Sequence, residues 1–427
     1  MFKISHEIRQ KLLGIILCMI VVALFVGESN DNKIFIPGEN LKWFHARAIL
    51  SISMIIFFVF TFIVTDVLKI FKNFLHRKDM LILSMVLVSL FIGFFNSDNY
   101  SYIFQRIQIK LPFLILPLCA SSFIISRKEF HRILFAFLLM TFFTSIYTFI
   151  NYIIYFDHIN ASYLQSKVMP SPINHVRFSI LSALATYTSY YLFKQNIKLF
   201  RFERIVVLTI GVFLFIFTHI YSVRSGIIAL YAMMFLEILV YIFKYKSYKK
   251  GFITFITIII SGILMFIFSP SLKNKMINTK QDIAVLQNNG NANYNSLATR
   301  FVSYEIAIDL FKENIILGCG LGDLEIKNTK LFNEKYPEIV TPIIPHNEFL
   351  YYLASMGLLG IITFSISFFF PLFYKRNYKN EFLLMIYVTL FFSFMTEPMI
   401  ENQLGVACSI VFIMLPLMVK EDERFDY

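Results

Sequence analysis

Residues 133–156 read ILFAFLLMTFFTSIYTFINYIIYF, a run that contains no charged side chain. A helix needs about 20 mostly apolar residues to cross the hydrocarbon core of a bilayer, and this run is long enough. Its apolar residues are continuous and do not alternate with a period of two, which favours a helix over a strand of a membrane barrel. The run therefore predicts a transmembrane helix.

The composition extends this prediction to the whole chain of 427 residues, of which 57% are hydrophobic and 15% charged. Soluble domains contain about 45–50% apolar and about 25% charged residues, so the composition excludes a soluble globular protein, a disordered chain and a secreted disulfide scaffold. We predict an all-α polytopic membrane protein with about twelve transmembrane helices. The predicted helices cover residues 12–27, 48–68, 80–95, 111–126, 133–156, 177–193, 204–220, 226–243, 251–269, 347–371, 382–396 and 404–419.

The distribution of charge predicts how the chain is oriented. Its 39 Lys and Arg residues exceed its 27 Asp and Glu residues, but the basic residues mostly flank apolar runs, so no nucleic-acid partner is predicted. On alternate sides of the predicted helices, 23 Lys and Arg lie on one side and 8 on the other, when the long segment near 270–345 is left out. Because cytoplasmic loops are enriched in Lys and Arg, both termini are predicted to be cytoplasmic.

A long polar segment divides the chain into three parts. Residues 1–269 hold the first nine predicted helices, residues 270–345 form one long loop, and residues 346–427 hold the last three helices and a short cytoplasmic tail. In a bacterial inner (plasma) membrane, the predicted orientation puts this loop in the periplasm. Loops longer than about 12–15 residues are usually functional or disordered. An Asn-rich stretch follows Lys280, and residues 296–317 predict a helix within the loop.

Arg224, Arg300 and His346 are the candidate functional residues on the predicted external side. Arg224 lies in a short turn, where a guanidinium can bind a phosphate or can simply snorkel to the interface. Arg300 lies near the start of the predicted loop helix, where anions are favoured, and the alternative is a solvated residue bonded to Glu305. His346 precedes the apolar run that begins at Phe349, where an imidazole can take a proton from a sugar hydroxyl or cap the helix.

Weaker candidates lie on the same predicted side. Arg177 opens the sixth run, and because an arginine entering a bilayer is costly, it is either a second phosphate contact or a snorkelling residue. Glu348 is placed to orient His346. Glu397 and Glu401, in the last external turn, could bind a cation or pair with these arginines, but they are interpreted as solvated loop carboxylates.

The cysteines predict neither a disulfide framework nor a metal site. Cys18, Cys119 and Cys408 lie inside apolar runs, and Cys319 lies in a polar segment. The sequence contains no CxxC pair and no Cys and His spacing that is typical of zinc. We therefore predict no metal and no cofactor.

Several phrases of the sequence together resemble one family. The phrase PHNEFLYYLASMGLLG at 345–360 resembles the signature of the O-antigen ligase and polymerase superfamily, a His-Asn dipeptide followed by a Gly-Leu-Leu-Gly turn of helix. The phrase LGCGLG at 317–322 resembles the glycine-rich stretch that precedes it. SVRSG at 222–226 and TRFVSYE at 299–305 resemble the arginine motifs before and within the periplasmic loop.

The resemblance implies an all-helical membrane glycosyltransferase of the GT-C type that works without a metal or a nucleotide sugar. Its donor would be a glycan on undecaprenyl diphosphate, and its acceptor a hydroxyl of the lipid A core or of a growing polysaccharide. By resemblance, Arg224 and Arg300 hold the donor diphosphate with help from Arg177 or a loop lysine, and His346 is the base. Supporting positions within the matching phrases are Asn347, Glu348 and Glu305.

Alternative functions remain open from the sequence. A ligase that attaches a finished O-antigen to the lipid A core and a polymerase that extends the polysaccharide on its carrier share this chemistry and differ in the acceptor. A transporter would place ionisable residues in mid-membrane and show two similar halves. Here Glu237 is nearly alone and is expected to pair with a polar neighbour, and His219 is interpreted as structural, so the enzyme is favoured.

Overall fold

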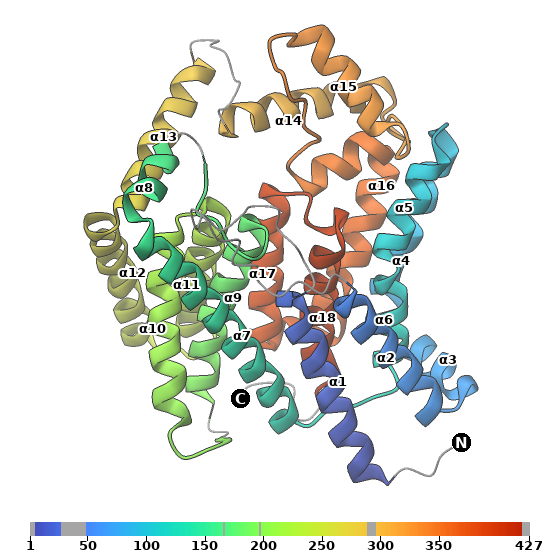
Figure 1. Cartoon of the computed structure of the whole chain (residues 1–427). Helices are drawn as coiled ribbons and strands as arrows, with labels where there is room; N and C mark the ends of the chain where they lie inside the picture. The colour runs from blue at the N-terminus through green and yellow to red at the C-terminus, as the bar shows by residue number, and fades with distance from the viewer. Residues whose placement is uncertain (1–4, 27–47, 165–166, 196–197, 288–295, 421–427) are drawn as a thin grey trace.

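The computed structural model describes residues 5–26, 48–164, 167–195, 198–287 and 296–420 (Figure 1). These residues form an all-helical bundle, which confirms the predicted polytopic α-helical class, and the Asn-rich stretch after Lys280 lies outside them. The elements are α1 (His6–Val26), α2 (Ile49–Val64), α3 (Val67–His76), α4 (Lys78–Val88), η1 (Ser89–Asn96), α5 (Tyr100–Lys110), α6 (Pro112–Ala120), α7 (Arg127–Ile154), α8 (Phe156–Leu164), α9 (His175–Lys194), α10 (Glu203–Tyr221), α11 (Arg224–Phe243), α12 (Tyr248–Phe268), α13 (Pro270–Gln287), α14 (Ser296–Glu313), α15 (Leu324–Lys335), α16 (Glu348–Phe373), η2 (Tyr374–Lys379), α17 (Glu381–Thr396), η3 (Met399–Glu401) and α18 (Gln403–Met418).

Fewer than twelve of the described helices are by themselves long and apolar enough to cross a membrane. Within the described ranges, 8 helices are long and apolar enough to cross a membrane, or 9 if the α2–α3 pair, bent by 111°, is one broken span. The apolar helices α17 and α18 are shorter than this. Helix α9 is rich in serine, threonine and tyrosine, and most of its residues are buried against α7, α10, α11 and α17. A helix enclosed by other helices does not need an apolar surface, so twelve crossings remain a prediction.

The first and last described segments lie at the same end of the bundle. The Gln10 side chain on α1 donates to Ile124 O (3.3 Å), and Ile125 N donates to Met418 O at the end of α18 (2.9 Å). Helices α13, α14 and α15 lie at the opposite end, at the top of Figure 1. The polar segment between α12 and α16 therefore covers one end of the apolar bundle.

Helix α16 is broken at Gly357, where the sequence predicted a continuous Gly-Leu-Leu-Gly helical turn. Gly357 has φ 62° and ψ −157°, a backbone conformation essentially restricted to glycine. The backbone groups freed by the break bond to residues 315–320, and we call this contact the glycine clamp. Its hydrogen bonds are Cys319 N to Ala354 O (2.8 Å), Gly320 N to Ser355 O (3.1 Å), Leu358 N to Ile315 O (2.9 Å) and Leu359 N to Ile316 O (3.3 Å).

The glycine clamp fixes where α14 sits. The clamp residues follow directly after α14, so the end of this helix is attached to the middle of α16. Beside the clamp, the Asp323 carboxylate accepts from the backbone of Asp98 and Asn99, which anchors the same segment to the start of α5. Arg300 on α14 is thereby held over the N-terminal end of α16.

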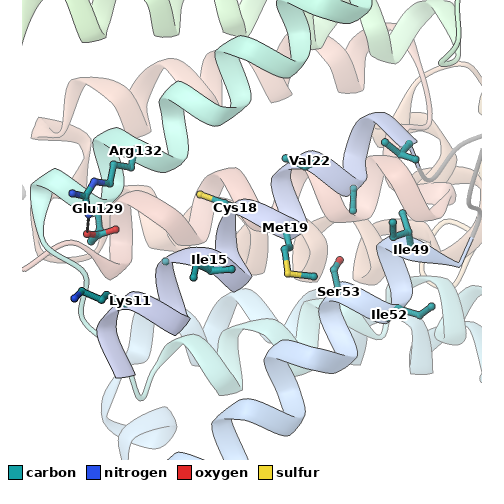
Figure 2. Close-up of a pocket in the computed structure, with 13 residues that line it drawn as sticks. Lys11, Ile15, Cys18, Met19, Val22, Ile49, Ile52, Ser53, Glu129 and Arg132 are labelled. Carbon is teal, nitrogen blue, oxygen red and sulfur yellow. Dashed lines mark hydrogen bonds and ion pairs between the residues drawn. The ribbon is translucent and has the colours of Figure 1, made fainter. Parts of the chain in front are cut away.

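A separate cavity of about 650 Å³ opens between α1, α2 and α7 (Figure 2). It is mainly apolar, and its charged residues Lys11, Glu129 and Arg132 gather at one end. There Arg132 is bonded to Glu129, and Lys11 is paired with Glu7 at 2.6 Å. No residue that lines this cavity belongs to the cluster described next.

Candidate active site

Glu397 lies at the centre of a cluster of charged residues at the α13–α15 end of the bundle. It follows α17, and its side chain is 12% exposed. Its Oε2 atom accepts a hydrogen bond from Nδ1 of His346 (2.9 Å) and lies 3.8 Å from the Arg300 guanidinium. The structure therefore brings two of the sequence-predicted residues, His346 and Arg300, to one carboxylate oxygen.

The start of α16 holds His346 in place. Asn347 caps this helix, since its side-chain oxygen accepts from Phe349 N (2.9 Å) and Leu350 N (3.1 Å). An Asn cap of this kind satisfies backbone donors that a helix start leaves open. Tyr304, one turn after Arg300 on α14, donates its hydroxyl hydrogen to His346 O (3.0 Å). The motif histidine is thus fixed by both its own helix and α14.

Arg224 occupies the first position of α11, after a tight turn in which Ser222 has φ 53°. Its guanidinium donates to Thr279 Oγ1 (2.7 and 3.1 Å) and to Asp282 Oδ2 (3.1 Å), both on α13. The same Asp282 oxygen accepts from Leu297 N at the start of α14 (3.3 Å). Asp282 therefore ties Arg224 to the helix that carries Arg300.

Lys275 lies close enough to Arg224 and Arg300 to interact with both of their charges. It is on α13 one turn before Thr279, and it is 7% exposed. Burial and the positive charges of Arg224 and Arg300 lower the pKa of Lys275 to about 8, while Asp282 opposes this shift. A buried ammonium beside two guanidinium groups makes this region strongly attractive to an anion.

Arg177 and His175 complete the cluster from the first turn of α9. Arg177 is 9% exposed, and His175 is close enough to interact with the charges of Glu397, Arg300 and Lys275. The N-termini of α9, α11 and α16 therefore converge on the cluster, and helix N-termini carry partial positive charge. The cationic side chains and the helix N-termini both contribute positive electrostatic potential to the cluster.

The electrostatics favour an ionised Glu397 in this cationic environment. Burial alone would raise the pKa of Glu397, but the hydrogen bond and charge of His346, with the charges of Arg300 and Arg177, lower it below its ordinary value. An ionised carboxylate only accepts hydrogen bonds, so Nδ1 of His346 is the donor and Nε2 is the basic nitrogen. The arrangement can bind an anion and, next to it, accept a proton.

The other sequence-predicted residues have contacts of a different kind. Glu348 is fully buried and accepts from Ile400 N (3.0 Å), so the carboxylate that contacts His346 is Glu397. Glu305 accepts from the Tyr336 hydroxyl (2.7 Å) on the exposed side of α14. Arg300 pairs with Glu397 and is not paired with Glu305 in the structure.

The sequence interpretation missed several members of the cluster. Glu397 and Glu401 are not solvated carboxylates, because Glu397 bonds His346 and Glu401 is paired with the buried Lys110. Lys275 and Asp282 gave no signal beyond their position on a polar helix. The available hint was that Lys275, Thr279 and Asp282 are spaced as one face of a helix.

Two interpretations of membrane-embedded polar residues are confirmed. Glu237 accepts from the Tyr190 hydroxyl (2.9 Å) and is paired with Lys194 (3.4 Å). The ring nitrogens of His219 contact Phe215 O (2.8 Å) and the Tyr231 hydroxyl (3.0 Å). Both residues lie outside the cluster and serve the packing of their helices.

One segment of the chain matches a known family. Residues 205–365 match the family model described as O-antigen ligase. Over these residues the chain is similar to the O-antigen ligase and polymerase superfamily. The matched segment contains Arg224, Lys275, Arg300 and His346, whereas Arg177 and Glu397 lie outside it. A search of the curated proteins gives no significant match. The match supports a glycosyltransferase of the ligase or polymerase type.

Proposed function

We propose that this protein is an O-antigen ligase-type glycosyltransferase that moves a glycan from undecaprenyl diphosphate to an acceptor hydroxyl. The observation that carries the proposal is the shared contact of His346 and Arg300 with Glu397, beside a group of buried and partly buried cations. This contact combines a proton acceptor and an anion-binding surface at one end of an apolar bundle. Transfer of a glycan from a lipid-linked diphosphate requires both a proton acceptor and an anion-binding surface.

The cations would hold the donor diphosphate. The cluster contains four cations, Arg224, Lys275, Arg300 and Arg177, and two carboxylates, Asp282 and Glu397. A doubly or triply charged leaving group can therefore be neutralised by side chains alone. Arginine suits this role because its planar fork of donors matches phosphate oxygens and stays charged. Among the described residues, no three His, Cys, Asp or Glu side chains gather to hold a metal ion.

The proposed reaction is a single inverting displacement. The acceptor oxygen forms a bond to the anomeric carbon while the bond from that carbon to the diphosphate oxygen breaks. The proton of the acceptor hydroxyl passes to Nε2 of His346, whose Nδ1 donates to Glu397, and undecaprenyl diphosphate leaves. Glu397 stabilises the imidazolium that forms and keeps the ring oriented.

The proposed site faces the outside of a bacterial inner membrane. The first and last described segments lie at the end opposite α13–α15, and most Lys and Arg outside the long loop are predicted on the side of the termini. By the positive-inside rule that side is cytoplasmic, so the cluster would face the periplasm. A donor flipped to the outer leaflet and the lipid A core would meet there.

Reconstitution of the full chain with a lipid-linked glycan and lipid A core tests the proposal. Wild-type protein should attach the glycan to the core, and His346→Ala should lower the rate by about 10²-fold or more, the usual contribution of a general base. His158→Ala, at an exposed position on α8, is the matched control and should retain the rate. Unchanged transfer by folded His346→Ala would contradict the assignment of the base.

The acceptor separates ligase from polymerase, which the same site would serve equally well. Deletion of the gene, followed by gel analysis of the cell's lipopolysaccharide, should abolish all attached O-antigen if the protein is the ligase. Survival of a single repeat unit on the core would instead assign polymerisation. The anomeric configuration of the product provides an independent check, since retention would exclude direct displacement.

A further inference from the structure

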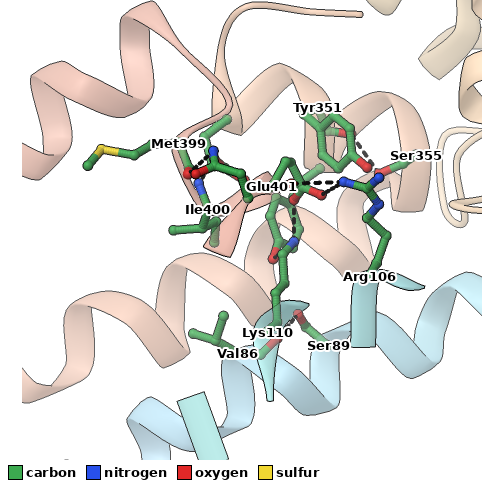
Figure 3. Close-up of polar contacts among 12 residues, drawn as sticks. Val86, Ser89, Arg106, Lys110, Tyr351, Ser355, Met399, Ile400 and Glu401 are labelled. Carbon is green, nitrogen blue, oxygen red and sulfur yellow. Dashed lines mark hydrogen bonds and ion pairs between the residues drawn. The ribbon is translucent and has the colours of Figure 1, made fainter. Parts of the chain in front are cut away.

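A second charged cluster lies directly beside the candidate site and contains a buried ion pair. Lys110, the last residue of α5, is fully buried, and its ammonium contacts the carboxylate of Glu401, which is 5% exposed (Figure 3). The ammonium also donates to the Tyr352 hydroxyl (3.1 Å) and lies 4.7 Å from the centre of that ring. Arg106, one turn earlier on α5, lies 3.6 Å from the other Glu401 oxygen.

This ion pair belongs to the turn that carries Glu397. Residues 397–402 connect α17 to α18, and Glu401 lies four residues after Glu397. From α5, Arg106 donates to Glu401 O (2.8 Å), and from the start of α16, Glu348 accepts from Ile400 N (3.0 Å). The turn is therefore held on both sides, by α5 through Glu401 and by α16 through Glu348.

The stability of the fold does not explain why this pair is charged. Removing two charges from water costs several kcal/mol per ion, and a well-packed apolar pair of similar volume is often equally or more stabilising. What a charged pair adds is a fixed geometry, because the ammonium must point at the carboxylate and at the Tyr352 hydroxyl together. The Lys110–Glu401 pair gives this fixed geometry to the 397–402 turn, which also carries Glu397 and its contact with His346.

We propose that Lys110 and Glu401 are positioning residues, which fix the 397–402 turn so that Glu397 contacts His346 and Arg300. In this arrangement α5, which supplies no residue to the anion cluster, controls the orientation of the imidazole. The effect on transfer rests on the proposed function of His346 as the base. The effect on the His346–Glu397 contact does not, and the two are tested separately.

The contact itself is measured by NMR of the full-length protein with ¹⁵N-labelled histidine. A ring N–H bonded to a carboxylate gives a strongly downfield proton resonance, which is assigned to His346 by its absence in His346→Gln. Lys110→Met combined with Glu401→Gln removes both charges of the ion pair, keeps the acceptor Glu401 O for Arg106, and should abolish or shift this resonance. The matched control replaces another buried pair, with His131→Gln and Glu203→Gln, and should leave the His346 resonance unchanged.

A folded Lys110→Met/Glu401→Gln protein that keeps the wild-type His346 resonance would overturn the proposal. If this variant does not fold, Arg106→Gln provides the second test, because this side chain is 18% exposed and its loss removes the contacts with Glu401 together with a cation–π contact to the Tyr102 ring (4.5 Å). A smaller shift of the same resonance is then expected. No shift in folded Arg106→Gln would also overturn the proposal.

Transfer rates give the functional readout. Loss of the pair should lower the rate about tenfold or more, since a small displacement of a catalytic group has effects up to about 10²-fold. In a Glu397→Gln background the same replacement should have almost no further effect, because the pair acts through Glu397. Multiplicative losses would indicate a role apart from Glu397. If the resonance behaves as expected but wild-type protein transfers no glycan, the proposed function fails and the positioning role stands.

Discussion

At the scale of single residues, Glu397 has two roles because one of its oxygens contacts both His346 and Arg300. Replacement by glutamine keeps the size of the side chain but removes the charge that favours the imidazolium. We expect Glu397→Gln to lower the transfer rate about 10²-fold with a smaller effect on donor KM. The pH profile is the matching check. Because the pKa of Glu397 is lowered, its carboxylate stays ionised into the acid range, so the ratio of the wild-type rate to the variant rate should be constant above that pKa and should fall below it.

The pKa of Lys275 leads to a prediction about donor binding at alkaline pH. Its pKa of about 8 means that the ammonium is charged below this pH and loses its proton above it. The cluster then has one positive charge fewer, so donor KM and the inhibition constant of inorganic pyrophosphate should rise about tenfold as the pH increases through 8. In Lys275→Arg the rise should disappear, because a guanidinium stays charged. A wild-type pH profile that is flat between 7 and 9 would contradict the assignment of Lys275 to the donor site.

The residues of the site were only partly accessible to sequence reasoning. His346, Arg224 and Arg300 could be predicted because each interrupts an apolar or turn context in a recognisable motif. Glu397 lies 51 residues after His346, and nothing local to it indicates that its turn meets the start of α16. Lys275 is likewise one of several lysines on a polar helix, and only the packing of α13 against the start of α11 distinguishes it.

At the scale of elements, hydropathy predicted where helices form, but it did not predict how they break. The predicted helix at 296–317 ends at Glu313 in the structure, because Asn314 and the following residues turn into the glycine clamp. The break in α16 at Gly357 depends on backbone partners about 40 residues earlier. Apolar periodicity records which side chains avoid water, and it contains no information about such distant backbone bonding.

The clamp can be tested at Gly357. A Cβ atom there would lie 2.4 Å from Ile316 O, and the positive φ of 62° is strained for any other residue. Gly357→Ala should therefore destabilise the protein by about 2 kcal/mol or more, seen as a lower thermal midpoint in detergent, and should displace Arg300 from the site. Gly262→Ala on α12 is the control, since a Cβ there meets only the Tyr231 hydroxyl at 3.2 Å. Equal stability of the two variants would contradict a structural role for the clamp.

At the scale of the whole molecule, the positions of the two ends of the bundle lead to a prediction of topology. Lys330 on α15 and Lys379 at the end of η2 are both exposed, and they lie on opposite sides of the α16 span. If α13–α15 cover the periplasmic end, Lys330→Cys should react with a membrane-impermeant maleimide in cells with a permeabilised outer membrane. Lys379→Cys should react only after lysis, because the positive-inside rule puts the η2 end in the cytoplasm. The native cysteines do not obscure this result, since Cys119, Cys319 and Cys408 are buried and Cys18 is only partly exposed within α1. The reverse labelling pattern would put the Glu397 cluster on the cytoplasmic side, where a donor already flipped to the outer leaflet cannot reach it.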